Sequence, residues 1–345
     1  MNWLIWLCFF AIFIGVLALD LGVLHRESRA MHVRQALGWT VVWILVALSF
    51  SGLVYGVYEH HWFGWRGMSE DAPNGSEAAI QFITGYLLEW SLSVDNIFVI
   101  AIIFTFMKIP AQFQYRVLFW GIVGAIVLRG AMIAMGAALI HAFDWTFYLF
   151  GAILLYSAAR MLRSEEEQFD PSKSMLVRVA RRVYPVTDKL DGERFFTIVD
   201  GARAATPLFV TLLLVDFADV VFAVDSIPAI FAVTQEPFIV FTSNAFAILG
   251  LRSLYFAIAG LMAMFKYIKL SLVFILGFVG VKMLLHHHLE IPHAISLGVI
   301  VGFLAIGILA SLWSTRRGTP GPIDRPGCVV LNITNPGTPS VSPDK

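Results

Sequence analysis

Nine apolar stretches, each long enough to cross a lipid bilayer as a helix, constrain the fold of this chain more than any other feature of its sequence. They lie at about residues 2–24, 38–58, 78–107, 116–141, 143–163, 206–231, 238–265, 268–288 and 291–313. A helix needs about 20 predominantly apolar residues to cross a hydrocarbon core about 30 Å thick. Because a backbone in lipid must satisfy its own hydrogen bonds, we expect an all-α membrane protein with about nine transmembrane helices.

The composition agrees with this fold class and narrows the function. Hydrophobic residues make up 58% of the 345 residues and charged residues 14%, whereas soluble domains are about 25% charged. The formal net charge is zero, so we expect no nucleic-acid partner. The two cysteines, Cys8 and Cys328, lie in the first stretch and near the C-terminus, so we expect neither a disulfide framework nor a thiolate metal site.

Positive charge in the connecting segments predicts the orientation, because Lys and Arg favour the cytoplasmic side. Loop 25–37 holds three arginines, segment 160–205 holds nine Lys or Arg, and residues 316–317 are both Arg, whereas loop 59–77 is mainly acidic. We therefore expect a multi-pass protein of the cell (inner or plasma) membrane with its N-terminus outside and its C-terminus in the cytoplasm. The first stretch lacks the basic start and cleavage site of a signal peptide, so we expect it to be a retained helix.

We expect the chain to divide into a polytopic membrane domain at 1–313, which includes a cytoplasmic segment at 164–205, and a cytoplasmic tail at 314–345. Within the segment, residues 172–186 form a basic amphipathic stretch. We interpret this stretch as a helix lying on the anionic inner leaflet, with a partner-docking helix as the alternative. The tail is rich in Pro, Gly, Ser and Thr, a composition that predicts disorder.

Two parts of the membrane domain resemble each other. "EWSLSVDN" at 89–96 and "DVVFAVDS" at 219–226 each place an acid six residues before an Asp that a small polar residue follows. Further along the chain, "VLRG" parallels "GLRS", and "ARML" parallels "VKML". We therefore predict two repeats, at 78–163 and 206–288. Each has three spans, so the second enters from the opposite side, which gives the inverted-topology repeat of many secondary transporters.

Ionisable residues inside these spans are the strongest sign of function, because a charge near a helix centre costs about 2.5–3.5 kcal/mol to insert. The candidate metal site consists of Glu89, Asp95, Asn96, Asp219, Asp225 and Ser226, and its accessory residues are Asp20, Asp216, Arg129, Arg252, Ser93 and Asn244. Carboxylate, amide and hydroxyl oxygens suit hard or borderline divalent ions such as Mn²⁺, Mg²⁺ or Ca²⁺. Four acids and two arginines leave a formal charge of −2, which one divalent cation would neutralise.

Helical spacing points the candidate ligands in two directions. The first acid of each motif shares a helical face with the motif's last polar residue, Asn96 or Ser226. On a straight helix, Asp95 and Asp225 lie about 100° around the axis from these two residues. Either a helix unwinds locally, which Pro228 would favour, or the carboxylates serve different steps along one ion path. The alternative to an ion site is internal pairing of the acids with Arg129 and Arg252 as structural salt bridges.

Three weaker features each allow two interpretations. Asp20 is either a gate or relay group or simply the polar end of the first span. Ser243 and Asn244, near the start of the predicted span at 238–265, either bind a cation or cap the helix, and capping is favoured. The histidines of 286–293 could capture metal, but exposed interfacial histidines are the commoner case.

The chain resembles the TerC family, and particularly its Alx-type branch, in three long motifs. These are "EWSLSVDNIFVIAIIF", "TPLFVTLLLVDFADVVFAVDSIPAIFAVT" and "PFIVFTSNAFAILGLRSLYF". The resemblance covers about residues 1–313. The family is named for tellurite resistance, and its better-understood members resemble manganese exporters within a wider superfamily that includes the LysE-type exporters. The resemblance implies a LysE-superfamily-like fold and assigns the acidic motifs to the metal site.

The sequence predicts a secondary transporter, not an enzyme, that exports a divalent metal ion, foremost Mn²⁺, from the cytoplasm. We expect no permanently bound cofactor, and the predicted partners are the transported ion and the lipid bilayer. Because no nucleotide-binding motif is present, we also expect a gradient to drive transport, with a proton as the coupling ion. An intramembrane aspartyl protease would need a Gly-x-Gly-Asp turn, which "SVDN" and "AVDS" lack. The remaining alternative is a stress or tellurite-resistance scaffold, or a redox modulator, without transport of its own.

Overall fold

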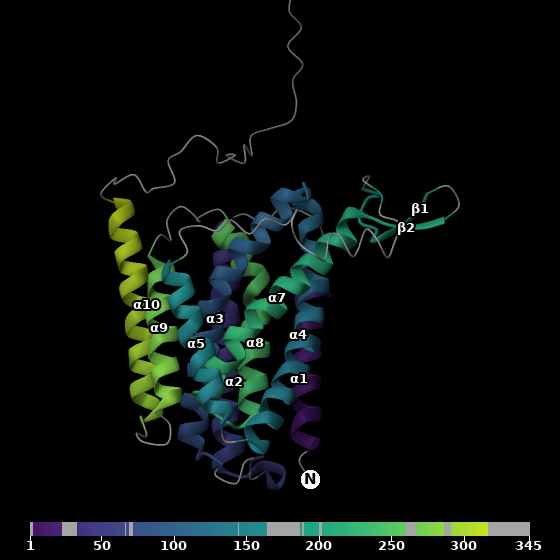
Figure 1. Cartoon of the computed structure of the whole chain (residues 1–345). Coiled ribbons are helices and arrows are strands. Elements are labelled where there is room, and N and C mark those ends of the chain that lie inside the picture. Colours follow the sequence, from purple (N-terminus) through teal and green to yellow (C-terminus); the bar gives the residue numbers. More distant parts are fainter. Residues whose placement is uncertain are drawn as a thin grey trace, which may run out of the picture.

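The computed structural model describes residues 3–22, 33–65, 67–68, 72–143, 145–163, 187, 190–199, 202–259, 267–285 and 291–316. The α-helices in these ranges are α1 (Trp3–Gly22), α2 (Val33–Glu59), α3 (Gly75–Phe106), α4 (Ala111–Ala142), α5 (Thr146–Arg163), α7 (Pro207–Phe231), α8 (Pro237–Ala259), α9 (Ile268–Leu284) and α10 (His293–Arg316). A short 3₁₀ helix (Trp62–Gly64) lies between α2 and α3. The helices form a bundle with α1 toward one edge and α10 at the other (Figure 1).

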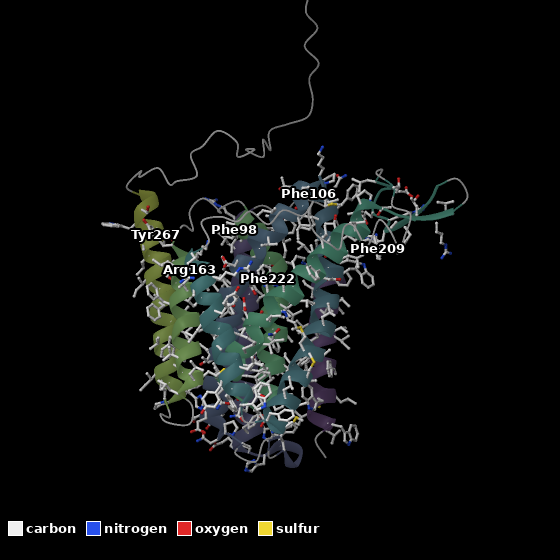
Figure 2. All side chains as sticks on the ribbon, viewed as in Figure 1. Phe98, Phe106, Arg163, Phe209, Phe222 and Tyr267 are labelled. Atoms are coloured by element: carbon white, nitrogen blue, oxygen red, sulfur yellow. The ribbon has the colours of Figure 1, made fainter. Side chains whose placement is uncertain are left out.

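Each predicted span coincides with one helix of the described ranges to within several residues, so the helical part of the prediction is confirmed. Six of these helices, α2, α3, α4, α7, α8 and α10, are long and apolar enough to cross a membrane. Large apolar side chains cover the outside of the bundle (Figure 2), and Leu45, Val127 and Leu309 are each more than half exposed. An apolar surface of this extent is unusual for a soluble monomer and fits an integral membrane protein.

Four helices form the part of the bundle that carries the polar side chains. Helix α3 packs against α8 and α4 packs against α7, while α3 also contacts α7 and α4 contacts α8. Around these helices, α5 packs on α9, α10 on α9 and α3, and α2 on α3 and α8. Helix α1 is held through aromatic rings, since the Trp6 and Phe9 centroids lie 5.2 and 6.1 Å from that of Phe238.

Local sequence signals explain where the two acid-bearing helices begin. Asn74 caps α3: its side chain accepts from the Glu77 N–H at 2.9 Å, and the Glu77 carboxylate accepts from the Asn74 N–H at 3.3 Å. Helix α7 begins at Pro207. Proline is well suited to this position, because the N–H groups of a first helical turn have no hydrogen-bond partner within the helix. The helix then continues through Pro228 to Phe231.

Small residues of α4 allow α7 to approach closely, as is common where membrane helices pack. A Cβ on Gly124 would lie 2.8 Å from both carboxylate oxygens of Asp216, and a Cβ on Gly121 would lie 3.3 Å from Val215 Cγ1. The carboxylate of Asp216 therefore lies directly against the backbone of α4 at Gly124.

The prediction of an all-α fold is wrong in one place, because a two-stranded antiparallel hairpin precedes α7. Strand β1 (Phe196–Val199) pairs with β2 (Ala202–Ala205), and the register places Val199 opposite Ala202. The strand sequence "FTIV" is aromatic and β-branched, and the sequence between the strands is Asp-Gly, a pair that favours tight hairpin turns. The hairpin lies at the end of the bundle where α10 finishes (Figure 1).

Some predictions concern residues outside the described ranges. These are the basic amphipathic stretch at 172–186, the histidines at 286–290, most of the predicted tail, and the side chain of Asp20. The predicted tail at 314–345 overlaps the end of α10, which continues to Arg316. The orientation in the membrane and the cytoplasmic location of 164–205 stay predictions.

Candidate cation site

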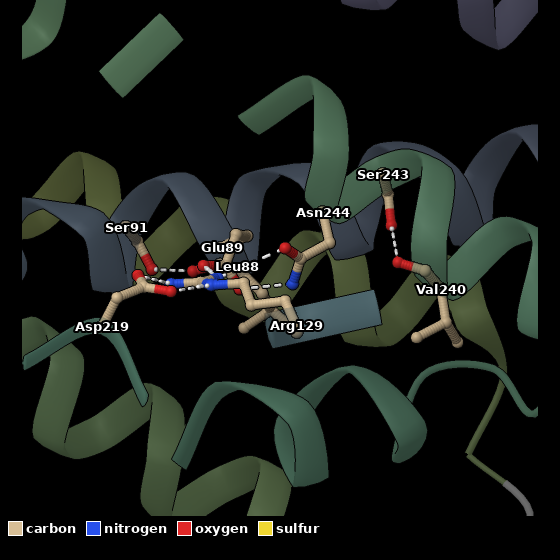
Figure 3. A network of polar contacts seen from close by, with 8 residues as sticks. All are labelled: Leu88, Glu89, Ser91, Arg129, Asp219, Val240, Ser243 and Asn244. Atoms are coloured by element: carbon tan, nitrogen blue, oxygen red, sulfur yellow. Dashed lines mark hydrogen bonds and ion pairs between the residues drawn. The ribbon is translucent and has the colours of Figure 1, made fainter. Parts of the chain in front are cut away.

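Four polar side chains from four helices meet in the interior of the bundle: Glu89 of α3, Arg129 of α4, Asp219 of α7 and Asn244 of α8 (Figure 3). Arg129 donates from Nε and Nη2 to Oδ2 and Oδ1 of Asp219 at 2.9 and 2.6 Å. Its Nη1 donates to Glu89 Oε1 and, at 3.3 Å, to Asn244 Oδ1. Asn244 Nδ2 in turn donates to Glu89 Oε2 at 3.1 Å. Because α8 begins at Pro237, Asn244 lies inside the helix, so the prediction that it caps a helix is wrong.

Burial makes the charges of this network depend on one another. Glu89 and Arg129 are each 2% exposed, and the Asp219 side chain is 14% exposed. Taking an isolated charge out of water costs several kcal/mol, so each charge of the network is stabilised by its oppositely charged partner. The guanidinium of Arg129 forms ion pairs with the carboxylates of both Glu89 and Asp219, so these three groups together carry a formal net charge of −1. The sequence-based alternative of pairing with Arg129 is thus confirmed for Glu89 and Asp219.

A cavity of about 20 Å³ adjoins the network and is lined by both Asn96 and Asp219. Its remaining walls are apolar and come from all four inner helices; they include Phe222 (Figure 2). A space of this size holds about one water molecule, and hence also a single desolvated metal ion. The structure therefore brings together one polar residue from each of the two acidic motifs.

Three further polar atoms on α3 and α7 have no hydrogen-bond partner within the described part of the chain: Ser93 Oγ, Ser226 Oγ and Asp216 Oδ1. Ser93 and Ser226 are almost completely buried. The large majority of buried polar atoms are hydrogen-bonded to protein or water, so these atoms are candidates for contact with a water molecule or an ion. Ser93 shares a helical face with Glu89, four residues earlier.

The second acid of each motif lies apart from this network. Ser157 of α5 donates a hydrogen bond of 2.5 Å to Asp225 Oδ1, and Arg160 of the same helix supplies a positive charge. Lys269 of α9 supplies the positive charge that acts on Asp95. The four predicted acids thus have three separate surroundings. Within the described ranges, no three His, Cys, Asp or Glu side chains gather in a way that could hold a metal ion.

Continuous helices explain this separation. Helix α3 runs from Gly75 to Phe106 and α7 from Pro207 to Phe231, so the acids stand on regular helices. At about 100° per residue, a six-residue offset turns the second acid roughly 120° away from the first. Local unwinding, one of the two predicted alternatives, is therefore not what the structure shows for α3 or α7.

The second arginine of the sequence prediction also lies apart from the network. Arg252 of α8 is buried, and its guanidinium carbon lies 4.6 Å from the centroid of the Tyr115 ring, within cation–π range. Sequence reasoning did not select Ser157, Arg160 or Lys269 as site residues. The parallel between "ARML" and "VKML" drew attention to Arg160, but its place beside Asp225 requires knowing that α5 packs on α7.

Buried ionisable side chains inside a helical bundle with an apolar surface define a polytopic integral membrane protein with an intramembrane polar site. Residues 74–319 match the integral membrane protein TerC family, and the chain belongs to this family.

Several relatives cover nearly all of the chain. An uncharacterized membrane protein of Myxococcus xanthus is 45% identical over 93% of this chain and 96% of its own length. Alx of Escherichia coli K12, whose name carries a proposed role as membrane-bound redox modulator, is 43% identical over 91% of this chain and 96% of its own. An uncharacterized membrane protein of Rickettsia bellii is 40% identical over 89% of this chain and 96% of its own length. No solved structure matches the chain.

Proposed function

We propose that this chain is a secondary transporter that exports divalent metal ions, foremost Mn²⁺, from the cytoplasm. The observation that carries the proposal is that the buried carboxylate of Glu89 and the partly buried carboxylate of Asp219 share one guanidinium beside a small cavity. Ionisable residues that face the interior of a membrane bundle typically mark ion pathways. Carboxylate, amide and hydroxyl oxygens are the ligands that Mn²⁺ and similar ions prefer.

The helix contacts support an inverted-repeat architecture in which α3–α5 and α7–α9 are the two repeats. Exchanging the repeats turns the contact of α3 with α8 into that of α7 with α4, and both contacts occur. The pairs α3 with α7, α4 with α8 and α5 with α9 map onto themselves, and all three pairs are in contact. These are the contacts that a two-fold axis between the repeats would produce. In such an architecture the network would lie where the repeats meet, as substrate sites do in transporters of this kind.

The polar residues outline a path from one end of the bundle. Asp216 lies one turn before Asp219, toward the end that carries the hairpin. The cavity of Asn96 and Asp219 comes next, and Glu89, two turns before Asn96 on α3, lies deeper. The distribution of Lys and Arg predicts that the hairpin end is cytoplasmic. A cytoplasmic cation would then meet Asp216 and Asp219 before Glu89.

We assign Asp95 and Asp225 to other steps of this path, together with Ser226. Each of the two acids lies within electrostatic range of a basic residue of another helix, Lys269 or Arg160, with which an arriving cation or proton would compete. A proton gradient is the proposed energy source, and a carboxylate that is protonated in one direction of the cycle would couple it to export.

The name of the Alx relatives favours a redox modulator as the second candidate function. Thiol–disulfide exchange requires two sulfur atoms within reach of each other. The two cysteines of this chain are Cys8, in α1, and Cys328, in the tail. A change in cellular redox state could instead follow from an altered metal content. A scaffold for stress or tellurite resistance would tolerate replacement of the buried acids while depending on segment 164–205.

Ion flux in proteoliposomes tests the proposal, with Mn²⁺, Mg²⁺, Ca²⁺ and Zn²⁺ each measured with and without a pH gradient. We expect Mn²⁺ flux that depends on the gradient and falls about tenfold or more in Asp95→Asn and Asp225→Asn, because each replacement removes an intramembrane charge. If none of the four ions moved, the transport proposal would be wrong. Undiminished flux in both variants would remove these two acids from the path.

A further inference from the structure

We propose that Arg129 is a tethered cation that occupies Asp219 while no metal ion is bound and must release it when one binds. The inference rests on the proposed function and adds a switch to the same site: Asp219 exchanges one cation, the guanidinium, for another, the transported ion.

The hydrogen-bond geometry favours this exchange. Arg129 engages both carboxylate oxygens of Asp219 through Nε and Nη2, the fork geometry in which Arg binds carboxylates most strongly. Asp219 also lines the cavity beside Asn96. A divalent ion in that cavity would take an oxygen of Asp219 as a ligand. With Arg129 still paired to both oxygens, the ion and the guanidinium would lie side by side on one carboxylate, which their mutual repulsion disfavours.

Arg129 has a second, preformed place to remain after it leaves Asp219. Its Nη1 already contacts Glu89 Oε1 and Asn244 Oδ1, so the guanidinium keeps acceptors on α3 and α8. Asn244 Nδ2 holds the other Glu89 oxygen and so fixes this carboxylate in position. Release of Asp219 therefore leaves no charged group of the network without a partner.

The charge of the surrounding groups favours a divalent over a monovalent ion. Asp216 lies one turn from Asp219, and its Oδ1 accepts no hydrogen bond within the described ranges. The carboxylates of Glu89, Asp216 and Asp219 with the guanidinium of Arg129 leave a formal charge of −2. One divalent cation would neutralise this group, whereas a monovalent cation would leave a buried net charge, which is costly.

The exchange also changes which helices are tied together. The Arg129–Asp219 pair links α4 to α7, which belong to different repeats of the proposed architecture. The contacts of Arg129 with Glu89 and Asn244 link α4 to α3 and α8. Binding of a divalent ion would therefore release the link to α7 and retain the other two. Such a difference between the empty and loaded states is what lets an ion shift a conformational equilibrium.

Mn²⁺ binding to the full chain in detergent, measured by calorimetric titration, tests this inference alongside Mn²⁺ flux in proteoliposomes. In Arg129→Gln the competing cation is gone, so we expect the Mn²⁺ Kd to fall by about tenfold or more while flux decreases, because nothing displaces the bound ion. Arg129→Lys keeps the charge without the fork, and its Kd should lie between the two. The matched control is Arg116→Gln. Arg116 is 39% exposed and pairs with Glu193 at 3.2 Å, so the Mn²⁺ Kd and flux of this variant should equal those of the unmodified protein.

The outcomes separate this inference from the proposed function. An Arg129→Gln variant that binds Mn²⁺ no more tightly than the unmodified protein, while that protein transports Mn²⁺, overturns the tethered-cation role and leaves transport in place. Should Arg129→Gln fail to fold, Arg129→Lys decides in the same way, since an unchanged or weaker affinity contradicts the exchange. An unmodified protein that neither binds nor transports Mn²⁺ contradicts the proposed function itself, and this inference with it.

Discussion

The contact between Gly124 and Asp216 predicts that one methyl group disturbs the packing of α4 on α7. In Gly124→Ala the new Cβ would lie 2.8 Å from both carboxylate oxygens, whereas ordinary contact begins at 3.4 Å. Either Asp216 or the spacing of the two helices must shift by several tenths of an ångström. Overpacking of this kind costs about 1–3 kcal/mol, and the better helix propensity of Ala offsets about 0.5–1 kcal/mol. We expect a net destabilisation of about 1 kcal/mol.

Thermal unfolding in detergent, followed by tryptophan fluorescence, measures this effect. For a chain of this size, about 1 kcal/mol corresponds to a decrease in Tm of roughly 2 °C. The matched control is Gly277→Ala in α9, where a Cβ meets no atom within 4 Å, so its Tm should not fall. In an Asp216→Ala background the Gly124→Ala change should cost nothing, because the clashing oxygens are gone. Equal Tm values for Gly124→Ala and Gly277→Ala would refute the reasoning.

Three other substitutions distinguish the site from the helices that support it. Glu89→Gln removes a buried charge but keeps an oxygen that can accept from Arg129; we expect a folded protein whose Mn²⁺ flux is lower by about tenfold or more, and an unchanged flux would contradict the role of the charge. Asn96→Ala removes a polar ligand from the cavity wall, so the Mn²⁺ Kd measured by calorimetry should rise, with Tm little changed. Asn74→Ala removes the α3 cap far from the site and should cost about 1 kcal/mol of stability without lowering flux per folded molecule.

The helices could be predicted from the sequence because their signal is local. The apolar run of Gly75–Phe106 exceeds the thickness of a bilayer core, and Asn74 with Glu77 marks its start. The hairpin was missed although "FTIVDG" carries a strong hairpin signal, because the hydropathy pattern sorts a chain into spans and connections and says nothing of short strands within a connection. The helical period predicts that Asp95 and Glu89 point in different directions from α3, and the continuous helix in the structure agrees with this.

The partners of the site residues could not be predicted in the same way, because they depend on which helices touch. Pairing of Arg129 with Glu89 was one of two sequence-based alternatives, and the choice required α4 to pack beside both α3 and α7. Ser157 and Lys269 carry no motif of their own; contacts of α5 with α7 and of α3 with α9 select them. The buried carboxylates could thus be identified from the sequence, whereas their grouping required tertiary structure.

Mn²⁺ flux through the Asp219→Asn variant tests the central claim most directly, because Asp219 both lines the cavity and holds Arg129. The measurement compares the unmodified protein and the variant in proteoliposomes, with size-exclusion profiles confirming that both are folded. The proposed transport predicts Mn²⁺ flux by the unmodified protein and its loss in a folded Asp219→Asn variant, which retains the shape of the side chain but not its charge. Flux at the unmodified rate in that variant would contradict the claim that divalent ions cross the membrane through this site.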